Sequence, residues 1–432
     1  MIVQHLVEKG LKKAQAVQAL MLTQETSEVD FENDRLKSAK SSQRTQIEVK
    51  VVLDGKLGTS STTDPDDIDG VVSRALEAAE FGSPVHFELP SAQSLVPVKV
   101  FDPALLPLEK PEMIHMGQQM MDMIKTYNPE ILAGSAVYKT VSKVEYANSR
   151  GAQYAADHTD FNVSAGGQLV RGKDILFVNE GLWQKKRSLD TEAIAASAIE
   201  YFRMAEQIAP IESGEIPVIF TPKGLTALLL SLSLAVDGKS VYLGASPLRD
   251  KLGQQIASPS LTILDDPFIE YGPNTSAFDN EGTVRKVTPL VEKGVLRNFI
   301  YDLDTAGRVG VKPTGHDSTR HLTNLVIQPG STSYETMLRN TAKGLLVHEF
   351  LGLGQGNPIN GEFSVNLFLA YKIENGKLVG RVKDVMLAGN AFEALKDITA
   401  ISTEREWVSG LFLGVTGLLP YIQVGKLSVT AK

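Results

Sequence analysis

A histidine and a glutamate stand side by side in GLLVHEFLGLGQGNPING, residues 344–361, and form the chain's only His-Glu pair, His348-Glu349. In many metallopeptidases a neutral imidazole binds the metal, and a neighbouring glutamate acts as base for the metal-bound water. The helical form of this motif has a second histidine four residues after the first. Here that position holds Gly352, followed by Leu353. The sequence therefore carries half of a catalytic signature.

The chain has no cysteine and only seven histidines. This excludes disulfides, thiol catalysis and thiolate metal ligands, so a metal would be held by imidazole, carboxylate or carbonyl groups. A catalytic zinc site needs three protein ligands. The nearest further histidines, His316 and His321, lie in a loop rich in glycine, proline and threonine. Two hypotheses stay open: an ordinary hydrogen-bonded His348 beside a surface Glu349, or a rebuilt metal site that adds His316 or His321.

Three glycines after the pair, Gly352, Gly354 and Gly356, suggest a phosphate loop at first sight. The segment lacks the terminal Gly-Lys-Ser/Thr of a phosphate loop and the spacing of a dinucleotide fingerprint. A crowded backbone crossing or a loop that lines a substrate site fits better, because glycine lets another strand approach closely. We therefore predict that these glycines contact an extended peptide or a partner strand.

The composition limits the classes of protein to consider. At 432 residues, with 43% hydrophobic and 22% charged residues, the chain is expected to form two or three globular domains. The net charge of -8 disfavours nucleic acid as a partner. The sequence has no apolar run of membrane-spanning length, and its first residues do not resemble a signal peptide. We expect no membrane association and a cytoplasmic location.

Periodicity and turn residues predict an α+β protein in several parts. Strands up to Thr63 are followed by a helix that we expect to begin at Asp64 as N-cap and to end at Gly82. Asp54-Gly55, Lys293-Gly294 and Asn375-Gly376 are expected at hairpin turns. The predicted parts are an N-terminal α+β domain (1–90), a proline-rich connector (91–111), a meander-plus-helix domain (112–212) and a β-rich C-terminal domain with the His-Glu motif (213–432).

Several long blocks make the chain similar to a known family. They include VDFENDRLKSAKSSQ and VVLDGKLGTSSTTDPDDIDGVVSRALEAA in the first part. The last part adds LTILDDP, FDNEGTVRKVTPLVEKGVLRNFIYDLDTAGRVG, PTGHDSTRHLTNLVIQPGSTSYETML, KGLLVHEFLGLGQGN and LAYKIENGKLVGRVKDVMLAGN. These blocks resemble the TldD/PmbA family, first described as modulators of DNA gyrase and regarded as zinc-dependent peptidase complexes. The resemblance covers nearly the whole chain and implies a three-part architecture.

The family has two branches. TldD-like members have H-E-x-x-x-H with a distal cysteine as third zinc ligand, whereas PmbA-like (TldE) members resemble inactive partners. Here His348 and Glu349 match the motif, Leu353 replaces its second histidine and no cysteine exists. The resemblance thus implies a PmbA-like subunit without its own metal, and zinc in the partner subunit.

The resemblance also implies partners and substrates. We expect a homodimer when the chain is alone and a heterodimer beside a TldD-like subunit, with the third domain as main contact. Unfolded or extended peptides are the expected substrate. Two alternatives are an active metallopeptidase with a rebuilt site at His348 and Glu349, and a non-enzymatic modulator that binds a gyrase-type protein.

Overall fold

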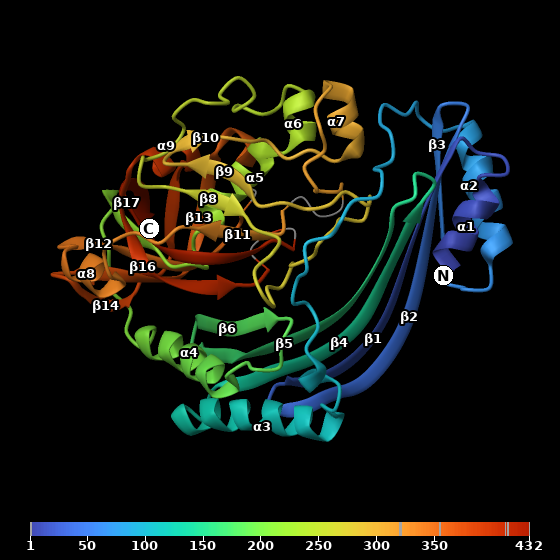
Figure 1. Cartoon of the computed structure of the whole chain (residues 1–432). Helices are drawn as coiled ribbons and strands as arrows, with labels where there is room; N and C mark the ends of the chain where they lie inside the picture. The colour runs from blue at the N-terminus through green and yellow to red at the C-terminus, as the bar shows by residue number, and fades with distance from the viewer. Residues whose placement is uncertain (1, 319–321, 354–355, 411, 413, 432) are drawn as a thin grey trace. The chain divides into compact units, whose positions relative to one another are not determined.

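The structure, a computed structural model, describes residues 2–318, 322–353, 356–410, 412 and 414–431 (Figure 1). The chain divides into two compact units. Unit 1 comprises Met1–Ala196, Pro267–Lys286 and Tyr301–Thr319, and unit 2 comprises Ser197–Asp266, Val287–Ile300 and Arg320–Lys432. Two segments from the C-terminal half of the sequence therefore fold as part of the N-terminal unit. The predicted domain ranges stay a prediction.

Unit 1 is built on one antiparallel sheet of six strands in the order β3-β2-β1-β4-β5-β6. The strands are β1 (Ala16–Glu32), β2 (Arg35–Leu53), β3 (Lys56–Thr62), β4 (Leu132–Asn148), β5 (Gln153–Arg171) and β6 (Asp174–Gln184). The helices are α1 (Ile2–Gly10), α2 (Ile68–Glu80), α3 (Lys110–Tyr127), α7 (Leu303–Val309) and the 3-10 turn Pro103–Leu105, and α4 (Thr191–Met204) contains the division between the units.

Helices cover this sheet at two places. Near one end, α1 and α2 bury Val3, Leu6 and Val71 in a core shared with the alternating residues of β1 and β2. Further along, α3 packs on β1, β4 and β5. Gly117 allows α3 to lie close to the sheet. A Cβ at this position would be only 2.7 Å from the Phe31 ring. The long strands thus gain their stability from apolar burial on the covered face.

Unit 2 contains an eleven-stranded mixed sheet in the order β10-β9-β8-β11-β17-β15-β13-β12-β7, with β14 paired to β13 and β16 to β17. Its strands are β7 (Gly214–Phe220), β8 (Ile263–Asp265), β9 (Thr288–Glu292), β10 (Val295–Leu296), β11 (Asn324–Ile327), β12 (Lys343–Leu351), β13 (Glu362–Glu374), β14 (Lys377–Arg381), β15 (Val385–Asn390), β16 (Ile398–Val408) and β17 (Thr416–Ala431). Its helices are α5 (Thr226–Val236), α6 (Gly238–Tyr242), α8 (Tyr334–Arg339), α9 (Ala391–Lys396) and the 3-10 turn Pro358–Asn360.

The strand β17 also pairs with β7, so β7, β12, β13, β15 and β17 form a closed ring of strands. The ring positions β12, which carries the His-Glu pair, between β13 and β7. Helix α5 is buried along nearly its whole length, as its continuous apolar sequence predicts. The α+β class predicted from the sequence is confirmed.

The turn predictions are confirmed by the backbone angles. Asp54-Gly55 has φ of 49° and 72°, Lys293-Gly294 has 48° and 78°, and Asn375-Gly376 has 52° and 76°. Two successive residues with positive φ are the requirement of a type I′ hairpin turn. The hairpin at Lys293-Gly294 is short, because β10 pairs with β9 only at Val295 and Leu296.

The predicted start of the second helix is wrong by three residues. Helix α2 begins at Ile68, after Asp67, and not after Asp64. The Asp64 carboxylate instead accepts a hydrogen bond from the Asp66 amide at 2.9 Å, and the Asp64 carbonyl accepts one from Asp67. The side chain therefore closes a local turn ahead of the helix, a competing use of the same short polar side chain.

The proline-rich segment between α2 and α3 contains only the 3-10 turn and one isolated bridge, Lys56 to Pro84. None of the helices in the described residues is long and apolar enough to cross a membrane.

Candidate functional site

The His-Glu pair lies where two parallel strands end together. Strand β12 pairs in parallel with β7 up to Val347 opposite Phe220. Parallel neighbours have their carboxyl ends at the same edge of a sheet. The residues that follow Phe220 therefore come next to His348 and Glu349.

The turn after β7 is tied to β12 by hydrogen bonds. The Thr221 amide donates to the Val347 carbonyl at 3.0 Å, and the Gly224 amide donates to the Thr221 hydroxyl at 3.1 Å. A Cβ on Gly224 would lie 2.2 Å from the Val347 carbonyl oxygen. Only glycine permits this close crossing of two backbones.

A β-bulge in β12 brings the side chains of His348 and Glu349 close together. The pairing with β13 runs from Val347 opposite Ala370 to Glu349 opposite Leu369, so His348 has no opposite residue. In a regular strand, adjacent side chains point to opposite faces. The bulge cancels this alternation, and a ring nitrogen of His348 lies within 4.8 Å of a Glu349 carboxylate oxygen.

The imidazole of His348 is buried, with 3% of its surface exposed. Its Nδ1 shares a hydrogen bond of 2.9 Å with the Thr221 hydroxyl. Its ring stacks on Tyr201 of α4, with 3.7 Å between ring centroids and 20° between planes. The Tyr371 hydroxyl donates to the Tyr201 carbonyl at 3.1 Å and so fixes this part of α4. The ring is held in one orientation from two sides.

The carboxylate of Glu349 forms an ion pair with the Lys223 ammonium. The side chains are 21% and 32% exposed, respectively. A carboxylate that acts as general base must be available to a water molecule bound at the reaction centre. Here the carboxylate is instead paired with the ammonium group of Lys223.

A catalytic zinc ion would need more donors than this pair supplies. Such a site needs three protein ligands and one open position. In unit 2, a ring nitrogen of His348 and a carboxylate oxygen of Glu349 lie within 4.8 Å of each other, and these two donors are one fewer than a catalytic zinc needs. The Glu349 carboxylate is already paired with Lys223, whereas the hydrogen bond at Nδ1 of His348 is compatible with metal binding through Nε2. The donor set of this unit does not fit a catalytic zinc.

The other predicted site residues are placed as follows. Leu353 lies just after β12 and is half-buried. Gly352 and Gly356 have φ of 87° and 106°, values that favour glycine, which gives both positions a local backbone reason for the residue. His316 belongs to unit 1, where its Nδ1 shares a hydrogen bond of 2.9 Å with Thr314. Gly354 and His321 lie outside the described residues, and the role of the glycines in binding a strand stays a prediction.

Sequence reasoning missed the three residues that surround the pair: Tyr201, Thr221 and Lys223. It did not identify the parallel pairing of β7 with β12. Once that pairing is known, the segment directly after the strand becomes the place to search, because loops at the carboxyl ends of parallel strands meet. Tyr201 gave no signal, since it approaches from a helix far away in the sequence.

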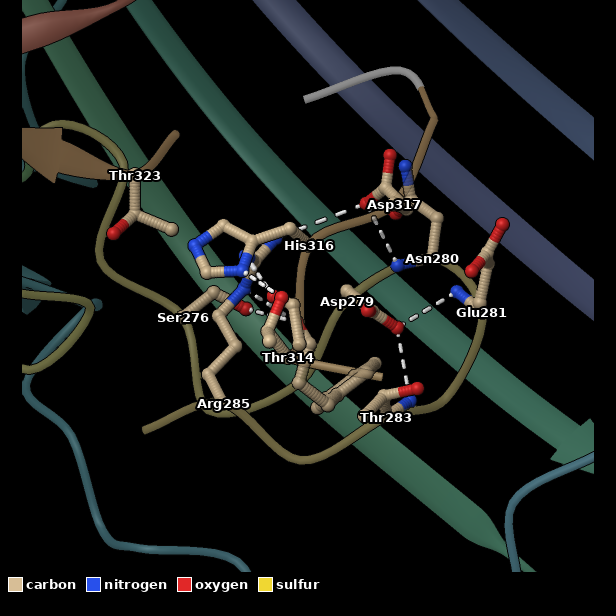
Figure 2. A network of polar contacts seen from close by, with 12 residues as sticks. Ser276, Asp279, Asn280, Glu281, Thr283, Arg285, Thr314, His316, Asp317 and Thr323 are labelled. Carbon is tan, nitrogen blue, oxygen red and sulfur yellow. Dashed lines mark hydrogen bonds and ion pairs between the residues drawn. The ribbon is translucent and has the colours of Figure 1, made fainter. Parts of the chain in front are cut away.

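A second polar cluster, in unit 1, was also missed. The Arg285 guanidinium donates to the Gly315 carbonyl at 2.5 Å and lies 3.7 Å from the Asp317 carboxylate (Figure 2). Asp317 also accepts from the Asn280 amide at 3.1 Å. Both charged side chains are almost fully buried. The cluster therefore ties together the two segments that join unit 1 from the C-terminal half of the chain.

Two carboxyl groups of this cluster have raised pKa values. Asp279 accepts amide hydrogen bonds from Glu281 at 2.9 Å and Thr283 at 2.8 Å, as Figure 2 shows. Burial nevertheless raises the pKa of Asp279 to about 6, against the opposing charge of Arg285. Burial, reinforced by Asp279, raises the pKa of Glu281 to about 8. The Glu281 carboxyl accepts from the Leu303 amide at 2.8 Å, at the start of α7.

Comparison with known proteins gives a consistent result. Residues 213–431 match the sequence model of the PmbA/TldA metallopeptidase C-terminal domain, and residues 19–79 match that of PmbA/TldA metallopeptidase domain 1. A protein named Metalloprotease from Methanothermobacter thermautotrophicus is 24% identical over 415 residues, which cover 91% of this chain and 89% of that protein. A Metalloprotease PmbA homolog from Haemophilus influenzae is 24% identical over 424 residues, which cover 94% and 89%.

Among solved structures, TldE from Thermococcus kodakarensis superposes with a TM-score of 0.93 at 21% identity and covers all of both chains. At this identity the likeness shows a shared fold. The match to the C-terminal domain alone covers just over half of the chain. The chain therefore belongs to the PmbA/TldD metallopeptidase family.

Proposed function

We propose that this chain is the zinc-free subunit of a PmbA/TldD-type peptidase complex that hydrolyses unfolded or extended peptides in the cytoplasm. The observation that carries the proposal is the ion pair between Glu349 and Lys223. The glutamate of the His-Glu motif is paired with the ammonium group of Lys223. The imidazole beside it is held by Thr221 and Tyr201.

The missing motif residues support the same proposal. Leu353 stands where active members have the second histidine, and the chain has no cysteine to act as third ligand. In this proposal the zinc and the hydrolytic step belong to a TldD-like partner subunit. This chain contributes the shape of the shared substrate cavity, and Gly352 and Gly356 line it next to the peptide.

Assembly is part of the proposal. We propose a homodimer for the chain alone and a heterodimer beside a TldD-like subunit, with the C-terminal domain as the main contact. Sedimentation velocity over a range of concentrations, with and without a TldD-like subunit, measures this directly. A chain that stays monomeric in both conditions contradicts the assembly.

The experiment that tests the function is Glu349→Gln in a reconstituted heterodimer. Glutamine keeps the size of the side chain but cannot act as a base, so peptide hydrolysis should be nearly unchanged. The matched control is the same substitution at the corresponding glutamate of the TldD-like subunit, which should abolish hydrolysis. If Glu349→Gln abolishes hydrolysis while the heterodimer persists, this chain supplies the base and the proposal is wrong.

A further inference from the structure

We infer that Lys223 is a built-in cation that occupies the place of a metal ion beside His348 and Glu349 and excludes divalent ions from the pair. The inference deepens the proposed function and rests on it. It assigns a specificity-determining role to a residue that lies outside the His-Glu motif. The replacement of the second motif histidine by Leu353 removes a metal ligand. Lys223 acts in a different way, because its positive charge repels a divalent ion.

The position of Lys223 is fixed by the residues on both sides. Thr221 is bound through its amide to Val347, and Gly224 is bound through its amide to the Thr221 hydroxyl. The Lys223 carbonyl accepts a hydrogen bond of 2.8 Å from the Thr226 hydroxyl at the start of α5. With its backbone held at these points, the lysine directs its ammonium to the Glu349 carboxylate. The local fold thus places the backbone of Lys223 where its ammonium reaches Glu349.

The bulge in β12 produces a place where a cation is favourable. It brings a His348 nitrogen and a Glu349 oxygen within 4.8 Å of each other. Such a pair is the beginning of a metal site, and Glu349 is only 21% exposed. A partly buried carboxylate without a partner is unfavourable. Either a metal ion or a side-chain cation can supply the positive charge, and in this chain Lys223 does.

The same charge opposes metal binding. A divalent ion that binds between His348 and Glu349 would displace the ammonium from Glu349 and remain close to it. Repulsion between a unit charge and a divalent ion about 4 Å apart amounts, even at the dielectric constant of water, to a change of at least about tenfold in affinity. A neutral residue of the same length at position 223 should therefore raise the affinity of the pair for a divalent ion.

The test is zinc binding by Lys223→Met in the full chain, measured by calorimetric titration with zinc chloride and by metal analysis after dialysis. Methionine keeps the length and apolar stem of lysine and removes its charge. We expect zinc affinity at least about tenfold higher than in wild type, and we expect Lys223→Met/His348→Ala to lose this gain. Lys372→Met is the matched control, because Lys372 also pairs with a glutamate of unit 2, Glu374 at 3.1 Å.

Lys223→Arg keeps the positive charge and should bind zinc no better than wild type, which separates charge from disturbed packing. If Lys223→Met folds and gains no zinc affinity, the inference is overturned while the proposed zinc-free function stands. A gain of equal size in Lys223→Arg or Lys372→Met also overturns it. If wild type itself binds one zinc that His348→Ala removes, both the inference and the proposed function fail.

Discussion

Glu281→Gln should remove a pH dependence of stability from unit 1. The Glu281 side chain is 8% exposed, and its carboxyl accepts the Leu303 amide. Burial raises its pKa from 4.5 to about 8, Asp279 and Asp302 add to the rise, and Lys50 opposes it. Glutamine retains an oxygen that accepts the same hydrogen bond and cannot ionise. The substitution therefore isolates the effect of the charge.

The sign follows from the protons bound in each state. Between pH 4.5 and about 8 the folded protein keeps the proton on Glu281, whereas the unfolded chain has lost it. The free energy of unfolding then falls as pH rises, by about 1.4 kcal/mol for each pH unit. From about pH 6 to about pH 7.5 the wild-type protein should lose about 2 kcal/mol through this group. Asp279, whose pKa is raised to about 6, contributes in the same direction at lower pH.

The assay is urea unfolding at about pH 6 and about pH 7.5, followed by probes in each unit. Glu281→Gln should lack the wild-type loss of about 2 kcal/mol and should be more stable than wild type at the higher pH. Glu270→Gln is the control, since Glu270 is an exposed residue of unit 1 paired with Lys99. An equal loss of stability with pH in wild type and Glu281→Gln would show that Glu281 is not the titrating group.

Two glycine substitutions test close backbone packing. Gly224→Ala places a Cβ 2.2 Å from the Val347 carbonyl oxygen and should destabilise unit 2 by about 3 kcal/mol or more, measured by urea unfolding. An effect below about 1 kcal/mol would show that the crossing is loose. Gly282→Ala has a φ of 80° and a Cβ 2.2 Å from the Tyr146 ring, so it should destabilise unit 1 by a similar amount. Gly151→Ala, with φ of 83° but open space around it, should cost only about 1 kcal/mol; equal losses at Gly282 and Gly151 would contradict the packing argument.

Local sequence patterns predicted much of the fold because their causes are local. Asp54-Gly55 and Asn375-Gly376 predicted hairpins since two positive φ angles restrict the choice of residues. The start of α2 could not be predicted in this way, because Asp64 has two competing uses that differ little in energy: a helix cap and a turn closed by Asp66.

The candidate site was predicted only in part because its contacts are not local. His348 and Glu349 were found from their residue types, but in a regular strand they would point to opposite faces. The bulge that brings them together depends on pairing with β13, and the partner Lys223 depends on the parallel pairing with β7. Thr221 lies 127 positions from His348 in the sequence. Neither hydrophobic periodicity nor a sequence motif predicts a contact between residues so far apart.

The last prediction concerns the missing second histidine. Leu353→His restores the H-E-x-x-x-H spacing, yet we expect the variant to gain no stoichiometric zinc, because Lys223 still holds Glu349. Adding Lys223→Met should raise zinc affinity above that of either single variant by at least about tenfold, since one change supplies a ligand and the other removes an opposing charge. Metal analysis after dialysis measures this. Stoichiometric, His348-dependent zinc in Leu353→His alone would mean that the lysine is no barrier and that the loss of one ligand explains the inactive motif. If the zinc affinity of the double variant stays low and equals only the sum of the two single effects, the absent third ligand is the stronger obstacle.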